Sequence, residues 1–247
     1  MDRSQGVVSR ETLKRIISDI SEIMKHPLHD HGIYYEHDET NMLMGYVLII
    51  PQNEGTPYQY GNYLFSIEYP KNYPYSPPKM TYLTNNGNTR FHPNLYRNGK
   101  VCLSLLNTWK GEQWTSCNTV SSILLNVTTL FSNDPFLHEP GINKDHESFD
   151  NYTKVIEYQN YKTAIYGILT DDKFMNYVNG AAEEFRDVIN DNYKKNMKTI
   201  IEQVEKKVSE LSPYEIPIDI PFYKMYDQWL DYKDLFVKLK EYNSKLV

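Results

Sequence analysis

The first amphipathic pattern of the chain covers residues 10–25. Apolar side chains recur there at helical spacing, as Leu13, Ile16, Ile17, Ile20, Ile23 and Met24. Ser9 can cap the first turn, and Glu11 suits the positive end of the helix dipole. The residue before a proline avoids helical geometry, so His26-Pro27 ends the pattern. The spacing predicts a helix over residues 10–25.

Three apolar segments then read as strands. Residues 41–50 form a nearly continuous apolar run, residues 63–69 alternate, and residues 79–83 form a shorter segment. The alternation predicts one shared face for Tyr63, Phe65, Ile67 and Tyr69. Residues 51–61 hold turn residues, and residues 70–78 hold prolines, which fix φ and remove backbone donors. The pattern predicts an antiparallel meander with a stiff surface loop.

The second half of the chain is mostly helical in pattern. Residues 120–131 have helical spacing and follow Asn118 or Thr119 as the cap. A polar junction at 143–150 precedes a further helical stretch that ends near residue 169.

The tail carries a longer helical pattern over residues 174–211. It would span roughly 55 Å as one helix, so we expect a break near residues 190–192. Residues 212–221 predict an extended connector because they contain Pro213, Pro217 and Pro221. Residues 226–242 predict a last amphipathic helix.

Composition narrows the function classes. Hydrophobic residues make up 40% and aromatic residues 14% of the 247 residues, which predicts a folded chain with a substantial core. The formal charge of −6 argues against a nucleic-acid partner. No apolar run is long enough for a membrane span, and no signal peptide precedes the first helix, so we expect a soluble protein without a membrane partner.

Cysteine and histidine usage argues against disulfides and metals. Two cysteines do not form a disulfide framework, which favours a reducing compartment. The spacing of His29, His31 and His37 fits no rigid ligand pattern, so we interpret them as solvated loop histidines and expect no metal.

The candidate chemistry lies in residues 91–114. His92-Pro93-Asn94 precedes the turn signal Asn98-Gly99, and Cys102 follows the turn. The chain can therefore fold back and bring Asn94 close to Cys102, which makes this segment a candidate active site.

These residues resemble the core signature of ubiquitin-conjugating enzymes. The segment 98–103, Asn-Gly-Lys-Val-Cys-Leu, stands in the family's order between His92-Pro93-Asn94 and Trp114. Further matches are Tyr69-Pro70, Tyr73-Pro74, Pro77-Pro78-Lys79 and Glu139-Pro140-Gly141. The resemblance covers roughly residues 9–142. Gly111-Glu112-Gln113-Trp114 and His138-Glu139-Pro140-Gly141 are typical of the long-form subgroup with a helical C-terminal extension.

The resemblance implies an α+β fold. Its order is an N-terminal helix, a four-stranded antiparallel meander, an irregular active-site segment and a central helix, followed by a mainly helical extension. We place the ubiquitin-conjugating core at residues 1–169 and the extension at residues 170–247. By analogy with the long-form enzymes, we expect a truncation after Leu169 to keep some thioester formation but to lose selectivity for an activating enzyme or ligase.

The resemblance also assigns roles. Cys102 is the expected nucleophile, since thiolate attack on an incoming thioester exchanges one sulfur for another at little net cost. Asn94 is tied to isopeptide formation and can donate its amide to a developing oxyanion. His92 could act as a general base, but the family reading makes it an anchor for the turn before Pro93.

Other site residues are less certain from sequence. The family often has an acid after the central helix that positions the attacking lysine, and His138 and Glu139 are the candidates. Tyr75, Ser116 and Cys117 match positions where family members dock ligases. The family usually has Trp-Ser-Pro-Ala where this chain has Trp114-Thr115-Ser116-Cys117, which puts the usual ligases in doubt.

The leading hypothesis is an enzyme that accepts ubiquitin or a ubiquitin-like protein from an activating enzyme and passes it, usually with a ligase, to a lysine of a protein substrate. No cofactor is implied, because ATP is used upstream. We expect a cytoplasmic or nuclear location. The alternatives are a catalytically silent ubiquitin-binding or scaffold protein of the same fold, and a cysteine hydrolase using Cys102 with His92 or His138.

Overall fold

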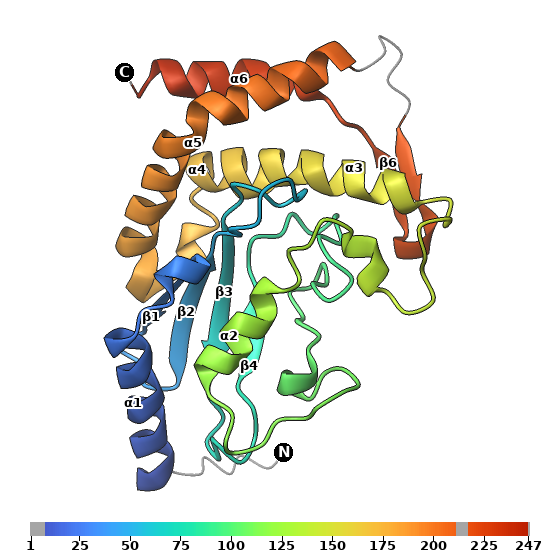
Figure 1. Ribbon diagram of the computed structural model, residues 1–247. Helices are drawn as coiled ribbons and strands as arrows, with labels where there is room; N and C mark the ends of the chain where they lie inside the picture. The colour runs from blue at the N-terminus through green and yellow to red at the C-terminus, as the bar shows by residue number, and fades with distance from the viewer. Residues whose placement is uncertain (1–7, 211–216, 247) are drawn as a thin grey trace, which may run out of the picture.

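A four-stranded antiparallel sheet forms the centre of the protein (Figure 1). The structure is a computed structural model that describes residues 8–210 and 217–246. The strands pair in chain order and are β1 Ile33–His37, β2 Met44–Ile49, β3 Tyr63–Glu68 and β4 Lys79–Tyr82. Helix α1, Arg10–Lys25, precedes the sheet, and α2, Val120–Thr128, follows it. This confirms the predicted α+β fold.

The predicted caps form as hydrogen bonds. The Ser9 hydroxyl accepts from the Thr12 backbone N–H at 3.0 Å, and α1 has the predicted bounds. Thr119, rather than Asn118, caps α2, with Ser122 completing a reciprocal capping box.

Strand β1 was absent from the sequence prediction, which placed its last residue in a loop. His37 is half-buried at the end of β1, where its Nδ1 lies 2.8 Å from the Tyr35 hydroxyl. The interpretation of His37 as a solvated loop residue is therefore wrong. Nowhere in residues 8–210 and 217–246 do His, Cys, Asp or Glu side chains gather in a group that could hold a metal ion.

The sheet is buried on both of its faces. The inner face contributes Tyr63, Phe65 and Ile67 to the main core, as the alternation predicted, together with Ile123 of α2. On the other face, Leu64 belongs to a second cluster. That cluster joins β2 to α5 and to the segment before it, and its members include Tyr46, Leu48, Phe174, Met175, Phe185 and Ile189. Burial on both faces explains the continuous apolar run of β2.

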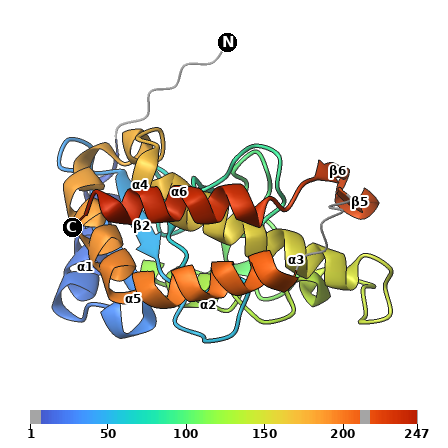
Figure 2. The ribbon, with the colours of Figure 1, turned by 90° about the horizontal axis from the view of Figure 1, so that it is seen from above.

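Three long helical segments cover one end of the sheet. Helix α3, Phe149–Gln159, continues through a π-helical segment, Asn160–Gly167, into α4, Ile168–Thr170. Helices α5, Ala182–Glu210, and α6, Tyr232–Ser244, lie side by side above α3 (Figure 2). Short 3-10 helices complete the chain at His29–His31, Ser104–Leu106, Pro135–His138, Met175–Tyr177, Asn179–Ala181 and Pro221–Tyr223.

The predicted break near residues 190–192 is wrong. Helix α5 is 29 residues long, about 43 Å, and runs without interruption through residues 190–192. The chain turns instead at residues 171–181. The Asn192 amide donates to the Tyr60 carbonyl and to Asn62 Oδ1, each at 3.1 Å. Asn192 therefore ties α5 to the loop before β3 and does not end the helix.

A small hairpin replaces the start of the last predicted helix. Strands β5, Ile218–Ile220, and β6, Met225–Gln228, pair antiparallel, and the helix begins only at Tyr232. Residues 218–221 of the predicted connector belong to the hairpin, and residues 212–216 lie outside the described part of the chain.

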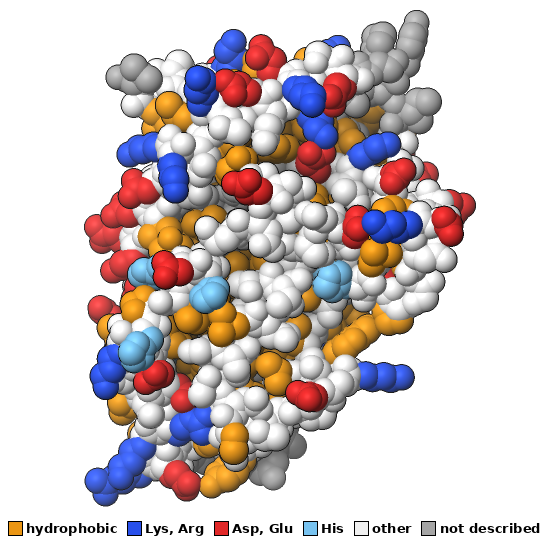
Figure 3. Space-filling view, viewed as in Figure 1, with side chains coloured by type: hydrophobic (Ala, Val, Ile, Leu, Met, Phe, Trp, Pro, Cys, Tyr) orange, Lys and Arg blue, Asp and Glu red, His pale blue; other side chains and the backbone are white. Residues whose placement is uncertain are grey.

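The C-terminal extension shares the main core with the rest of the chain. Tyr193, Ile200 and Val204 of α5, with Tyr232 and Leu239 of α6, are buried in the same cluster as the sheet and α2. The boundary at residues 169 and 170 remains a prediction, but the core is continuous across it. Charged side chains in Figure 3 gather at the rim and over the C-terminal helices, and the centre of that face carries few. Within the described ranges, no helix is long and apolar enough to cross a membrane.

Candidate active site

A tight hairpin brings the predicted site residues together. Leu95 pairs with Val101, and the Gly99 N–H donates to the Tyr96 carbonyl at 2.9 Å. Gly99 has φ +84°, and a Cβ there would lie 2.9 Å from Thr81 Cγ2, so the position favours glycine. The turn signal Asn98-Gly99 thus acts as predicted, and Asn94 and Cys102 face each other across the hairpin.

Asn94 and Cys102 exchange two hydrogen bonds. The Cys102 N–H donates to the Asn94 carbonyl at 2.9 Å, and Asn94 Nδ2 donates to the Cys102 carbonyl at 2.6 Å. Both residues are buried, with 8% of Asn94 and 1% of Cys102 exposed. The Asn94 amide is therefore fixed at the residue that carries the thiol, within a site that excludes most water.

The two cysteines lie in opposite environments. Cys102 is buried beside Asn94, whereas Cys117 is exposed in the loop before α2, and both are free thiols. At 1% exposure, Cys102 lies beneath the surrounding side chains.

His92 is held by the backbone of the same segment. Its Nδ1 accepts the Asn94 N–H at 3.0 Å, and its ring meets the His138 ring edge-on with centroids 4.7 Å apart. Accepting at Nδ1 places the imidazole proton on Nε2. Burial, with His138 and Arg90 nearby, lowers the pKa of His92 well below its ordinary value. A proton taken at Nδ1 would break the bond to Asn94, so this geometry suits an anchor better than a general base.

The candidates after the central helix point to different partners. His138 Nε2 lies 3.0 Å from the Ser132 hydroxyl, and burial lowers the pKa of His138. The Glu139 carboxylate accepts a hydrogen bond from the Tyr223 hydroxyl at 2.6 Å, and therefore faces the C-terminal hairpin. The structure brings His138 onto His92, while Glu139 contacts the extension.

Arg90 is a site residue that the sequence analysis missed. Its Nε donates to the His92 carbonyl at 3.2 Å, and a terminal nitrogen donates to the Pro93 carbonyl. The guanidinium lies 3.3 Å from the centre of the Tyr96 ring and 5.1 Å from that of Tyr223. Arg90 thus links the His92-Pro93-Asn94 segment to the C-terminal hairpin. Its position two residues before the triplet was the only sequence signal.

The hairpin of the extension adds further contacts. The Arg90 backbone N–H donates to Met225 Sδ at 3.4 Å, and an Arg97 guanidinium nitrogen donates to the Tyr223 carbonyl. The Tyr223 ring packs on Phe136 and Tyr152 of the main core. The extension therefore braces the active-site segment directly.

The predicted ligase-docking residues lie along α1. Tyr75 is 68% exposed, and its hydroxyl donates to Glu11 at 3.0 Å. Arg15 donates to the carbonyls of Ser116 and Asn118, each at 2.6 Å.

Trp114 connects the two loops of this face. Its ring is buried, and Nε1 donates to the Pro74 carbonyl at 2.7 Å. The proline loop, the loop 115–118 and the start of α1 therefore form one surface, with Tyr75 and Cys117 exposed on it.

The fold and the Asn94–Cys102 hairpin are those expected of the ubiquitin-conjugating family. The profile of the ubiquitin-conjugating enzyme family matches residues 15–165, so the chain belongs to that family. Within the family, the chain is similar to the enzymes named ubiquitin-conjugating enzyme E2 Z.

The similarity to those enzymes is substantial but partial. Identity is 37% over 160 residues to the Xenopus tropicalis protein, covering 64% of this chain and 50% of that protein. Identity to the Homo sapiens protein is 37% over 158 residues, covering 63% of this chain and 44% of that protein. The Caenorhabditis elegans protein named probable ubiquitin-conjugating enzyme protein 17 is 32% identical over 215 residues, covering 82% of this chain and 28% of that protein. The chain spans about half, or less, of the length of these relatives.

The family match confirms the resemblance stated from the sequence motifs, including the long-form subgroup. The roles of individual residues in this chain remain proposals.

Proposed function

We propose that this chain accepts ubiquitin or a ubiquitin-like protein from an activating enzyme as a thioester on Cys102, and transfers it to a lysine of a protein substrate. The observation that carries the proposal is the hydrogen bond from Asn94 Nδ2 to the Cys102 carbonyl, at 2.6 Å. This bond fixes an amide donor beside the residue that would hold the acyl group.

The chemistry consists of two acyl transfers. In the first, the Cys102 thiolate attacks the thioester of the activating enzyme, forming a new carbon–sulfur bond while the activating enzyme's thiolate leaves. In the second, a neutral lysine amine attacks the Cys102 thioester and loses a proton to solvent, an isopeptide bond forms, and the carbon–sulfur bond breaks so that Cys102 leaves as thiolate. Asn94 donates to the oxyanion of the second step or supports the loop that presents Cys102. Neither step needs a cofactor, since ATP is used upstream by the activating enzyme.

The remaining site residues receive supporting roles. His92 anchors the segment through Asn94, and His138 packs on His92. Glu139, whose carboxylate is bonded to Tyr223, couples the loop after the central helix to the extension. We assign ligase docking to Tyr75, Ser116 and Cys117, because all three are exposed on one surface with α1. We propose a cytoplasmic or nuclear location.

The test is a charging assay with ATP, activating enzymes and tagged ubiquitin, analysed with and without reductant. We expect a reductant-sensitive band that Cys102→Ala abolishes and that Cys102→Ser converts to a reductant-resistant ester. Cys117→Ser is the matched control and should charge normally. Normal charging of Cys102→Ala would refute the assignment. A panel of modifiers and activating enzymes that gives no charging at all would favour the catalytically silent alternative.

A further inference from the structure

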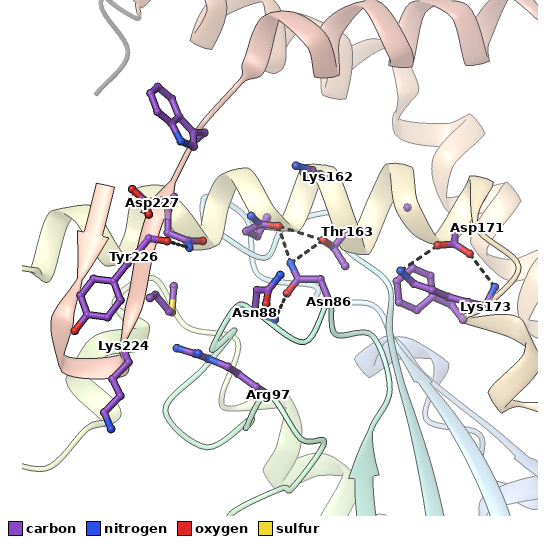
Figure 4. A pocket seen from close by; sticks show the side chains of 16 residues that line it. Asn86, Asn88, Arg97, Lys162, Thr163, Asp171, Lys173, Lys224, Tyr226 and Asp227 are labelled. Atoms are coloured by element: carbon purple, nitrogen blue, oxygen red, sulfur yellow. Dashed lines mark hydrogen bonds and ion pairs between the residues drawn. The ribbon is translucent and has the colours of Figure 1, made fainter. Parts of the chain in front are cut away.

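A cleft of about 570 Å³ opens between the C-terminal hairpin and the body of the protein. Strand β6, with Tyr226 and Asp227, forms one wall, and the loop with Asn86 and Asn88 forms another (Figure 4). Lining residues between Gln159 and Phe174, from the π-helical segment and the turn after α4, close the cleft. We call this the hairpin cleft. It is separate from the Asn94–Cys102 pair, neither of which lines it.

Cationic side chains dominate the lining of the hairpin cleft. Four of them, Arg97, Lys162, Lys173 and Lys224, stand against two carboxylates, Asp171 and Asp227. Lys173 is already paired with Asp171 at 3.0 Å. Within residues 8–210 and 217–246, the other three cations form no ion pair with an acidic side chain. The chain as a whole has a formal charge of −6, so this excess of positive charge is local.

The cations come from segments that are distant in sequence. Arg97 lies in the active-site hairpin, Lys162 in the π-helical segment and Lys224 in the turn before β6. The Arg97 guanidinium uses one donor on the Tyr223 carbonyl, which leaves further donors of its fork for a ligand. Because three elements each place a cation around one cleft, the positive electrostatic potential is concentrated there.

The remaining lining favours a peptide over a polyphosphate. The side-chain amide of Asn88 and the amide oxygen of Gln228 are of the kind that bond to peptide groups, whereas Asn86 Nδ2 donates to Gln159 Oε1 at 3.0 Å within the wall. Tyr226 and Trp229 are 54% and 53% exposed at the cleft and offer aromatic surface to an apolar side chain. Asp227 would repel a phosphate chain or a nucleic-acid backbone, whose regularly spaced charges cannot avoid it.

We infer that the hairpin cleft binds an acidic peptide segment of a partner protein. Carboxylates of the segment pair with Arg97, Lys162 and Lys224, and an apolar side chain packs on Tyr226 or Trp229. The inference is independent of thioester chemistry, because binding requires neither Cys102 nor a charged modifier.

The experiment measures binding of a fluorescein-labelled peptide of about ten residues, about 33 Å when extended, in which Glu and Asp surround one Phe. Fluorescence anisotropy is followed while the full chain is titrated in. Lys162→Gln/Lys224→Asn removes two cations at exposed positions, and asparagine suits the φ of +52° at residue 224. Lys194→Gln/Lys198→Gln, at exposed positions of α5, is the control with the same change in net charge.

We expect saturable binding whose affinity falls as the salt concentration is raised. The cleft variant should bind the peptide about tenfold more weakly, and the α5 control should bind it as tightly as the unmodified chain. A peptide with Lys in place of every acid should not bind. Thermal melts establish that both variants are folded. The inference is overturned by absence of saturable binding, by equal weakening in the α5 control, or by tighter binding of a single-stranded oligonucleotide of equal charge.

Discussion

Replacing Asn94 with alanine tests the assignment most directly. The substitution removes the donor that lies 2.6 Å from the Cys102 carbonyl. The carbonyl then loses that partner in a buried site, where only 8% of Asn94 and 1% of Cys102 are exposed. Leaving a buried acceptor unsatisfied costs about 1 to 3 kcal/mol, which lowers the melting temperature by about 2 to 4 °C per kcal/mol in a chain of this size.

The catalytic effect should be larger and confined to one step. Loss of one donor to the oxyanion of an acyl transfer costs about 2.7 to 4 kcal/mol, so discharge to free lysine should slow about 100- to 1,000-fold. Charging by the activating enzyme should change little, because thiol–thioester exchange requires attack by Cys102 and not activation of an amine. The two steps should therefore separate.

The assay charges the protein, stops charging by removing ATP, and follows loss of the thioester after addition of lysine. Asn98→Ala is the matched control, since Asn98 Oδ1 accepts the Lys100 N–H at 3.1 Å at the exposed tip of the same hairpin. Asn98→Ala should lower stability without slowing discharge. The reasoning fails if Asn94→Ala discharges within about threefold of the unmodified protein, which is below 1 kcal/mol. It also fails if charging and discharge fall together with the melting temperature, which would make Asn94 structural.

Three further outcomes are expected. Iodoacetamide should label exposed Cys117 well before buried Cys102 in the folded protein, and equal rates by peptide mass spectrometry would contradict the burial of Cys102. Burial lowers the pKa of His92 and of His138 in the folded protein. In the unfolded chain both imidazoles bind protons near the ordinary histidine pKa of about 6.5, so acid favours unfolding. The melting temperature should therefore fall between about pH 7 and about pH 5, and a constant value would refute this. Truncation after Leu169 should give aggregated protein, because α5 and α6 bury part of the main core. A soluble, cooperatively melting fragment that still forms a thioester would contradict this and would support the expectation drawn from sequence.

The active-site hairpin could be predicted from sequence because its determinants are local. Asn98-Gly99 encodes the turn, and the positive φ of Gly99 makes that encoding strict. The pairing of Asn94 with Cys102 then follows from the hairpin. Arg90 could not be predicted in the same way, since its role depends on Tyr223 and Met225, which only the tertiary fold brings near.

The fold shows the same division between local and distant determinants. Helix α1 matched its predicted bounds because its apolar stripe lies within it, and its cap residue Ser9 and the ending signal His26-Pro27 directly flank it. Strand β1 was missed because its sequence, Ile-Tyr-Tyr-Glu-His, lacks clean alternation and gains its burial from β2. Strand β6 was read as helix because Tyr226 falls in phase with the helix that follows, while Asp227, with φ +53°, locally breaks that geometry.

The brace between Arg90 and the C-terminal hairpin has a consequence for how the protein matures. Arg90 and Met225 are separated by 135 residues, so the contact closes a very long loop. During synthesis on the ribosome, the segment 92–102 emerges and can form its turn long before Tyr223 and Met225 exist. A nascent chain can therefore hold the nucleophile and its asparagine before Arg90 gains its contacts with Tyr223 and Met225. The contacts of Arg90 with the hairpin form only after Tyr223 and Met225 have been translated.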